Sequence, residues 1–465
     1  MSSLRSPETI TAHRAPLRPL LAKEIREIVA GRALWILLLL MCPLIGYSFF
    51  QAVSLYAESS VAAQQSPVLA ASLSPLDGVL VPTFGASYVA VTLLFPFVAI
   101  RVLGQEKESG TLRLLIQLPY GTSTLIGAKL AAILAAVVVV SLPALATLGW
   151  WTWLGGHLSA PETSNLVGGH VLYGLLVGAI ALFAAAVTDS TATAAILALA
   201  FTIGSWVLDF TIAGRPGILE WLARLSLTQI LRNFEQGLLS AGLVLGVIAA
   251  IGGFATLAGI WLPPGVAARV KLAQSIACIL ATVVVVALIA QIGFARDVTE
   301  DRRNSFPAAD ARALAKLSEP LRVSVHLAPE DPRFIDLQRN MLSKLARAMP
   351  DATIRLAAAR QPVATGTGDE NYGQIEFTYG ARTDVTRSTS PREILPLLYG
   401  LAQVPVPQPD PGGGYPGYPL VADAQTTLPF FFAVLPLLIA LAWWLSRRPP
   451  RQAFAFTTET TNDRP

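Results

Sequence analysis

The segment GQEKESGTLRLLIQLPYGTSTLIGAK, residues 104–129, lies between two long apolar stretches and is itself charged and amphipathic. Glu106 and Glu108 come just before a run of leucines. Acidic side chains favour a helix start because they oppose the partial positive charge of unpaired backbone N–H groups. We predict a helix from about Ser109 that ends before Pro119, because the residue before a proline is pushed out of the α region.

The predicted helix has one apolar face. Leu112, Leu115 and Ile116 recur at helical spacing, and Leu114 and Leu118 widen the stripe. A helix with such a stripe lies flat on the membrane surface or against a partner protein. Periodicity alone leaves a second interpretation open, in which a loop helix packs on its own bundle.

The composition is that of a membrane protein. Of 465 residues, 53% are hydrophobic and only 14% are charged, and the mean hydropathy is +0.55; soluble domains are more polar. About 20 apolar residues are needed to cross ~30 Å of hydrocarbon. We predict eight transmembrane helices near residues 33–56, 82–102, 125–150, 166–187, 190–210, 238–262, 271–294 and 427–445.

Lysine and arginine in the short loops set the expected orientation. Residues 1–32 and the tail 447–465 are rich in arginine, whereas the loops 57–81 and 151–165 carry neither residue. Both termini are therefore expected in the cytoplasm, with residues 295–426 outside it. Topology accounts for most of the net charge of +4, so no nucleic-acid partner is expected.

The stretch before the first predicted span is amphipathic as well. Residues 17–29 show the pattern of a helix that lies in the membrane interface. Its apolar stripe consists of Leu17, Leu20, Leu21, Ile25, Ile28 and Val29, and its charged face of Lys23, Glu24, Arg26 and Glu27. Residues 1–32 are accordingly assigned to a cytoplasmic N-terminal segment with an interfacial helix.

These features resemble the ABC-2 type transporter permeases. The chain carries an E-x-E-x-G-T-L string from Glu106, then a leucine pair, a proline and a Gly-x-Lys that ends at Lys129. The resemblance implies a six-span permease domain over residues 33–262, in which residues 104–118 form a coupling helix that docks on a cytosolic ABC ATPase. The docking residues that it implies are Glu106, Glu108, Gly110, Thr111, Leu112, Leu115 and Pro119.

The resemblance also implies a location, the bacterial cytoplasmic (inner) membrane, and partners. A second permease copy, in a homodimer or a pair with a related permease, would complete the pathway among membrane lipids. The chain has no G-x-x-x-x-G-K-[ST] phosphate loop, which an ATPase of this kind requires. We therefore expect it to be no enzyme, with no cofactor or metal of its own and with ATP and Mg²⁺ on the partner subunit.

Three functions are compatible with these sequence features. The favoured one is the permease subunit of an ATP-driven ABC-2 exporter. The alternative is a membrane-anchored envelope scaffold or sensor with a permease-derived fold and no transport. A secondary transporter ranks third, because the predicted span interiors lack the ionisable residues that ion-coupled carriers use.

Residues 295–403 have the pattern of a small α/β domain. Helices are predicted near residues 308–317, 333–349 and 391–403, and strands near 321–327, 353–356, 374–379 and 382–386. This order favours a thioredoxin-like layer fold. The domain has no cysteine, so we expect a binding or gating platform and no thiol chemistry.

The string D-V-T-E-D-R-R at residues 297–303 resembles the start of the auxiliary domain of gliding-motility-type ABC transporters. A Pro/Gly-rich linker over residues 404–426 then leads to the eighth predicted helix, assigned to 427–446. The resemblance implies a permease fused to a shortened auxiliary domain. In the permease part, residues 217–236 are predicted as a further amphipathic helix.

Overall fold

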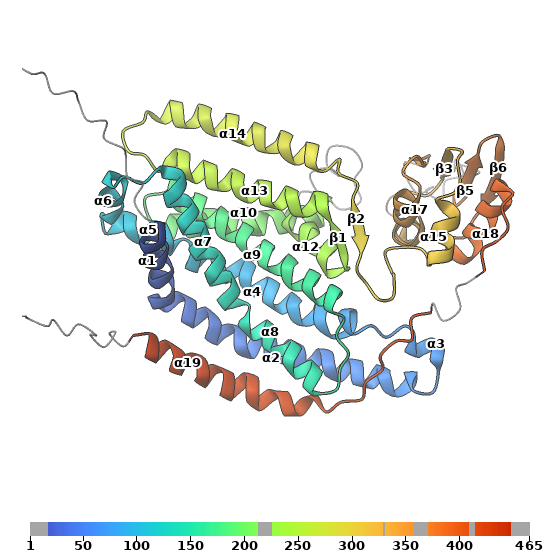
Figure 1. Ribbon diagram of the computed structural model, residues 1–465, viewed down its shortest axis with the longest axis horizontal. Coiled ribbons are helices and arrows are strands. Elements are labelled where there is room, and N and C mark those ends of the chain that lie inside the picture. Colours follow the sequence, from blue (N-terminus) through green and yellow to red (C-terminus); the bar gives the residue numbers. More distant parts are fainter. Residues whose placement is uncertain (1–16, 213–225, 329–330, 358–370, 409–413, 448–465) are drawn as a thin grey trace, which may run out of the picture.

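The computed structural model of the protein describes residues 17–212, 226–328, 331–357, 371–408 and 414–447. Within these residues, eight helices are long and apolar enough to cross a membrane, which confirms the expected number. Figure 1 shows them side by side in one bundle with a small sheet domain at one end. Their bounds are α2 (Arg32–Ala63), Leu76–Glu108, Thr122–Trp153, α9 (Ala160–Val187), α10 (Thr191–Ile212), α13 (Ala241–Trp261), α14 (Ala268–Ile289) and Ala424–Ser446.

Three of the spans are built from consecutive helical segments. These are η1 (Leu76–Leu80) with α4 (Val81–Ala99) and α5 (Arg101–Glu108); α7 (Thr122–Val140) with α8 (Leu142–Trp153); and η3 (Ala424–Thr427) with η4 (Phe430–Val434) and α19 (Leu435–Ser446). The break between α7 and α8 falls at Ser141, two residues before Pro143. A proline has no backbone N–H to donate and crowds the preceding turn, which accounts for the break.

The centre of the bundle is α9, the most buried of the spans. It packs against α4, α7, α10 and α13. Gly174 and Gly178 let α7 approach closely, since a Cβ at either position would press on Val137 or Ile133. Small residues serve this purpose in membrane helices, where association depends on close packing.

Two spans lie at the periphery. α14 packs along α13, and the last span packs along α2. Phe431 in η4 lies directly over Gly46 of α2 and is fully buried, and its ring is 6.0 Å from that of Phe49. The side chains of α14 and α19 are otherwise largely exposed, as expected for helices that face lipid.

The two ends of the bundle carry different structures (Figure 1). One end, which we call the α6 end, carries α1 (Leu17–Ala30), α5 and the short helix α6 (Thr111–Gln117). The other, which we call the sheet end, carries α3 (Pro67–Ala70) and the sheet domain. The quoted segment and the sheet domain are thus separated by the full length of the spans.

The N-terminal helix differs from the expected pattern at one charged residue. α1 packs against α7, and its buried residues are Leu20, Glu24 and Ile28. Glu24, assigned above to the charged outer face, is therefore on the inner face. The reason is the buried Lys129 in α7, to which the Glu24 carboxylate is bonded.

The sheet domain contains the predicted elements in the predicted order. Its helices are α15 (Ala308–Leu314), α16 (Pro332–Leu337) continued by η2 (Gln338–Leu342) and α17 (Ser343–Ala348), and α18 (Pro391–Ala402). Its strands are β3 (Leu321–Val325), β4 (Thr353–Leu356), β5 (Ile375–Tyr379) and β6 (Arg382–Thr386), in the spatial order β4-β3-β5-β6. β3 and β4 are parallel, and the other two pairs are antiparallel. A separate hydrophobic core that includes Val323, Leu337 and Phe377 holds these layers together.

A second, two-stranded sheet joins the spans to this domain. β1 (Leu238–Ser240) pairs antiparallel with β2 (Ala295–Asp297). Leu238 was expected in the sixth span, but that span begins at Ala241. The Ser240 side chain caps it by accepting a hydrogen bond from the Leu243 N–H. Just before it, α12 (Leu227–Glu235) is the described part of the amphipathic helix predicted over residues 217–236; residues 217–225 lie outside the described residues.

Candidate functional site

The quoted segment folds as two helices joined at Gly110. This residue has a φ of 75°, in the left-handed region that favours glycine. α6 starts at Thr111, two residues after the expected start, and ends before Leu118, which is extended ahead of Pro119. Glu106 and Glu108 do not lie at the start of this helix as expected. They lie in the last turns of α5, because the second span continues to Glu108 as one helix.

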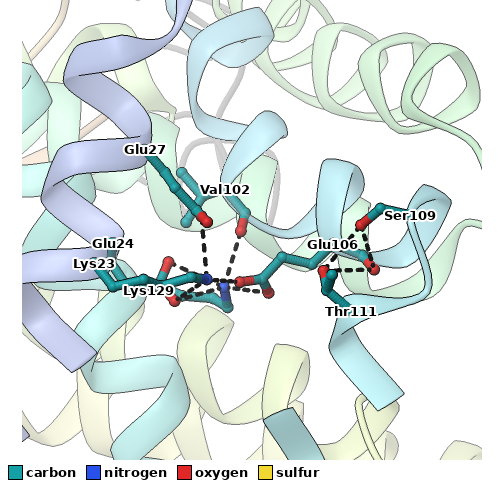
Figure 2. A network of polar contacts seen from close by, with 8 residues as sticks. All are labelled: Lys23, Glu24, Glu27, Val102, Glu106, Ser109, Thr111 and Lys129. Carbon is teal, nitrogen blue, oxygen red and sulfur yellow. Dashed lines mark hydrogen bonds and ion pairs between the residues drawn. The ribbon is translucent and has the colours of Figure 1, made fainter. Parts of the chain in front are cut away.

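Glu106 is buried in a network of charged side chains (Figure 2). Its exposed fraction is 4%, and its Oε2 accepts a hydrogen bond of 2.6 Å from the Nζ of Lys129, which is 1% exposed. Its Oε1 is paired with Lys23. Lys129 also donates to both carboxylate oxygens of Glu24, at 3.2 and 3.1 Å, and to the Val102 carbonyl at 2.9 Å. The network thus joins α1, α5 and α7.

The charges in this network offset one another. Lys23 also pairs with Glu24 and Glu27, at 3.2 and 3.1 Å, so two ammonium groups face three carboxylates. Burial raises the pKa of Glu24, and the charge of Lys129 opposes that rise. Burial lowers the pKa of Lys23, but its hydrogen bond to Glu106 and the neighbouring carboxylates outweigh this, so that the pKa is raised overall.

The same carboxylates are close enough to hold a metal ion, because ligand oxygens of Glu24, Glu27 and Glu106 lie within 4.8 Å of one another. The chemistry of the group argues against that use. Lys23 and Lys129 already donate to these carboxylates, and a metal ion would have to displace the two ammonium groups. The donor set therefore fits internal ion pairing.

The opposite side of α5 is bonded to the turn between α9 and α10. Lys107 Nζ donates to the carbonyls of Ala186 and Thr188, at 2.6 and 2.9 Å. The Glu108 Oε1 accepts from the Thr191 N–H at 3.1 Å. A cation thus lies at the C-terminus of one helix and a carboxylate at the N-terminus of the next, the favourable arrangement for both helix dipoles. Glu108 does cap a helix as its type suggests, but that helix is α10.

Two further contacts fix the geometry around α5. Gly104 faces Thr191, and a Cβ on this glycine would lie 2.5 Å from the Thr191 Cγ2. The Thr111 hydroxyl lies 2.9 Å from that of Ser109 and donates to the Glu106 carbonyl at 3.4 Å. We call α5 with these partners on α1, α7, α9 and α10 the α6-end joint.

The expected docking residues divide into two groups. Glu106 and Leu112 are buried, so neither presents its side chain to a partner. Glu108, Gly110, Thr111 and Pro119 are exposed and Leu115 is half-buried. The most exposed apolar side chains of α6 are Leu114, at 64%, and Leu118, which follows the helix, at 46%.

The sheet end has a polar joint of its own, built by the D-V-T-E-D-R-R string. The Asp297 carboxylate accepts from the N–H and hydroxyl of Thr299, at 3.1 and 2.6 Å, from the Asn304 N–H at 3.0 Å and from the Ser305 hydroxyl at 2.7 Å. The Asn304 side chain in turn donates to the Gln236 carbonyl at 2.7 Å. The string is therefore folded back against the end of α12.

Other residues of the string bond to the spans. The Glu300 N–H donates to the Glu162 Oε1 at 2.7 Å, and the Glu300 carboxylate lies 2.9 Å from the His157 Nε2. Arg303 is paired with Asp77 in η1 and donates to the Ser74 hydroxyl at 2.9 Å. Residues 297–303 and these partners form what we call the sheet-end joint.

The Pro/Gly-rich linker meets the same joint from the other side. The Tyr418 ring stacks on the His157 ring at 3.7 Å, and the Tyr56 hydroxyl donates to the Tyr418 carbonyl at 2.7 Å. The Leu420 N–H donates to the Ser60 hydroxyl at 2.9 Å. His157 thus contacts both chain segments that connect the sheet domain to the spans.

The partners of Glu106 were not predicted from the sequence. Lys129 is a lone charge within an apolar run, and Glu24 lies four residues from both Leu20 and Ile28 on the apolar stripe of α1. The positions of Lys129 and Glu24 were the sequence features from which a buried ion pair could have been predicted. α9 starts at Ala160, six residues before the expected span, and therefore carries Glu162 in its first turn and His170 further along, both buried.

Comparison with known proteins identifies the family. The sequence model of the ABC-2 family transporter proteins matches residues 18–296. The match extends beyond the expected permease region to include α14 and part of β2, and leaves out the remainder of the sheet-domain region. No curated protein and no solved structure matches the chain.

Membership of this family indicates the general role of such a chain. Its permeases are non-catalytic membrane subunits that generally work with a cytosolic ATPase subunit. The multiple apolar helices of this chain agree with that arrangement. Since the match covers more than half of its residues, this multi-pass membrane protein belongs to the ABC-2 transporter family and has the build of its transmembrane permeases.

Proposed function

We propose that the protein is the permease subunit of an ATP-driven ABC-2 exporter, and that residues 104–118 are its coupling helix. A separate cytosolic ATPase would bind ATP and Mg²⁺ and dock on α6. The observation that supports this proposal is the difference between the two sides of α6. On one side, α6 is connected to α5, whose charged side chains are bonded to α1, α7, α9 and α10. On the other side, Leu114 and Leu118 are exposed.

The exposed face of α6 supplies the docking contacts in this proposal. Leu114 and Leu118 are the apolar centre of that face, with Thr111, Leu115 and Pro119 beside them. Exposed apolar side chains at a polar surface favour contact with a partner protein. Gly110 sets the angle at which α6 leaves α5, and Leu112 fixes α6 to the bundle.

Movement of α6 would reach the spans through the charged side chains of α5. Glu106 would pass it to α1 and α7, and Lys107 and Glu108 would pass it to α9 and α10. Buried charge pairs suit this role, because separating them leaves uncompensated charge in a region of low dielectric constant. Glu106 is accordingly proposed as a positioning residue that does not touch the ATPase.

The remaining assignments form part of the same proposal. Both termini would be cytoplasmic, and two permease copies, or a pair with a related permease, would form the pathway. Residues 295–403 would be an extracytoplasmic, thioredoxin-like auxiliary domain of the gliding-motility type. The strand order β4-β3-β5-β6, with one parallel pair, and the position opposite α6 support this assignment.

The docking proposal is tested by recovery of the ATPase. The full-length permease carrying Leu114→Asp with Leu118→Asp is purified with the ATPase encoded beside it. We expect at least a tenfold loss of co-purified ATPase, because two carboxylates would enter an apolar contact. Ile335→Asp is the matched control, since Ile335 is an exposed apolar residue of the sheet domain. Full recovery of the ATPase with the double variant would refute docking on α6.

A further inference from the structure

An open cleft lies beside the α6-end joint, between α4–α5 and the start of α10. Its volume is about 360 Å³. Phe97 and Ile100 line it on one side, and Ala192 and Ala195 on the other. Since both walls belong to helices that span the membrane, the cleft opens near the membrane surface at the α6 end. A partly apolar cleft at this depth is within reach of lipid molecules.

The polar residues of the cleft are ordered along one face of α5. Arg101, Gln105 and Glu108 all line the cleft, and their spacing places them on the same side of the helix. Phe97 and Ile100 lie nearest the membrane interior, Arg101 comes next, and Glu108 is nearest the end of the span. At 1.5 Å per residue, Arg101 and Glu108 are about 10 Å apart along the axis. The cleft therefore changes from apolar to cationic to anionic toward the surface.

Arg101 differs from the lysines around it. Lys23, Lys107 and Lys129 are each bonded to acceptors of the protein. Among the residues that the structure describes, the Arg101 side chain has neither an ion pair nor a hydrogen bond, and it is exposed. A guanidinium group binds phosphate oxygens through two parallel N–H donors. Glu108 is also exposed, and within the described part of the chain only its Oε1 is bonded.

We propose that this cleft binds an amine-bearing, zwitterionic glycerophospholipid of the phosphatidylethanolamine class. Its phosphate would bond to Arg101, its ammonium group would pair with Glu108, and its first acyl methylenes would contact Phe97 and Ile100. In such a lipid the acyl chains, phosphate and amine follow one another toward the water, which is the order of the matching residues on α5. Basic pockets between spans are a known setting for head-group binding.

The bound lipid would connect α5 with α10 next to the existing bond between Glu108 and Thr191. It would thus add a contact between two elements that the α6-end joint already holds together. The proposal depends only on the membrane-spanning helices and the cleft. It stands whether or not an ATPase docks on α6.

The test uses the full-length protein in nanodiscs that contain a photoactivatable phosphatidylethanolamine or, separately, a photoactivatable phosphatidylglycerol. Peptides that span residues 97–108 and 191–195 are examined by mass spectrometry after illumination. We expect both peptides to be labelled, with phosphatidylethanolamine preferred. Millimolar inorganic phosphate should leave the labelling unchanged, which distinguishes a lipid from a free anion.

Three variants sharpen the result. Arg101→Gln should lower labelling by both lipids about fivefold, the effect of one basic residue at a membrane surface. Glu108→Gln should remove only the preference for the amine-bearing lipid. Ala195→Trp should lower labelling by filling the cleft, and Arg113→Gln, an exposed arginine of α6 outside the cleft, is the matched control.

The proposal is overturned if Arg101→Gln and Ala195→Trp label as strongly as the wild type, or if the two peptides remain unlabelled. Equal labelling by both lipids in the wild type would also overturn the proposal, because the amine would then gain nothing from Glu108.

Discussion

The α6-end joint and the sheet-end joint use the same chemistry at very different depths. Each sets carboxylates against cationic side chains and backbone N–H groups. The exposed fractions of Glu106 and Lys129 are 4% and 1%, whereas those of Glu300 and His157 are 30% and 36%. Partly exposed pairs contribute up to about 1 kcal/mol, while breaking a buried pair costs about 3–5 kcal/mol.

The difference indicates which joint can open. Water can replace the side-chain contact of Glu300 with His157, so this part of the contact between the sheet domain and the spans can be released at small cost. It cannot readily replace the partners of Glu106, so α5 has to move together with α1 and α7. The protein thus has a stiff connection at one end and a releasable connection at the other.

The largest effect is expected from Lys129→Met, which tests the stiff joint. It leaves Glu24 and Glu106 without their shared partner and should lower the free energy of unfolding in detergent by about 3–5 kcal/mol. Burial raises the pKa of Glu24, so the folded variant takes up a proton on this carboxyl more readily as the pH falls. The loss should therefore be smaller at pH 5 than at pH 8.

The control for this experiment is Lys129→Met with Glu106→Gln, which removes one charge of each sign. It should recover part of the lost stability. A loss below about 1 kcal/mol for the single variant would mean that water reaches the pair, and the contrast between the joints would fail.

A smaller effect is expected from Gly104→Ala, which tests the packing of α5 on α10. The added methyl would press on Thr191, and overpacking of this kind costs about 1–3 kcal/mol. Gly127→Ala is the matched control, since a Cβ there meets nothing within 4 Å and alanine favours a helix. Thermal unfolding followed by circular dichroism compares the two; equal midpoints would show that α10 moves aside freely.

Asp297→Asn tests the releasable joint. The amide accepts fewer of the hydrogen bonds from Thr299, Asn304 and Ser305, which should cost about 1–2 kcal/mol locally. Hydrogen exchange of residues 295–305 should become faster, while that of α5 stays unchanged. Asp351→Asn, at an exposed turn of the sheet domain, is the control. Faster exchange in α5 would show that the two joints are coupled, contrary to this description.

The smallest effect is expected from His157→Ala, which removes the contact with Glu300 and the stacking on Tyr418. Because the pair is partly exposed, the loss should stay below about 1 kcal/mol. Limited proteolysis of the linker should nevertheless become faster, since His157 contacts both connecting segments. His157→Gln, which keeps a hydrogen-bond donor, should give an intermediate rate; unchanged cleavage with alanine would remove His157 from the joint.

Local patterns were sufficient to predict much of the fold. β4 and β6 have the predicted bounds, because alternation and the turn at Gly380, with a φ of 60°, are local signals. The spans were predicted from length and hydropathy. The same reasoning failed at Leu238, because an apolar residue before a span looks like part of it, and its pairing with Asp297 is a long-range contact.

The candidate site was less predictable for the same reason. The amphipathic α6 follows from its own sequence, but the burial of Glu106 depends on Glu24 and Lys129, which lie in two other helices. Likewise, the position of Glu108 at the start of α10 depends on how α9 and α10 turn. Glu108 does lie at a helix start, as expected of a carboxylate, but only the three-dimensional arrangement shows that the helix is α10.

Phe431 of the last span lies directly over Gly46 of α2, and this contact limits how the protein can assemble. The chain's own last span already covers that stretch of α2, and the glycine leaves no side chain that could be withdrawn to admit another helix. That side of α2 is therefore closed to intermolecular packing, and a helix from another molecule would have to pack on a different face of the bundle.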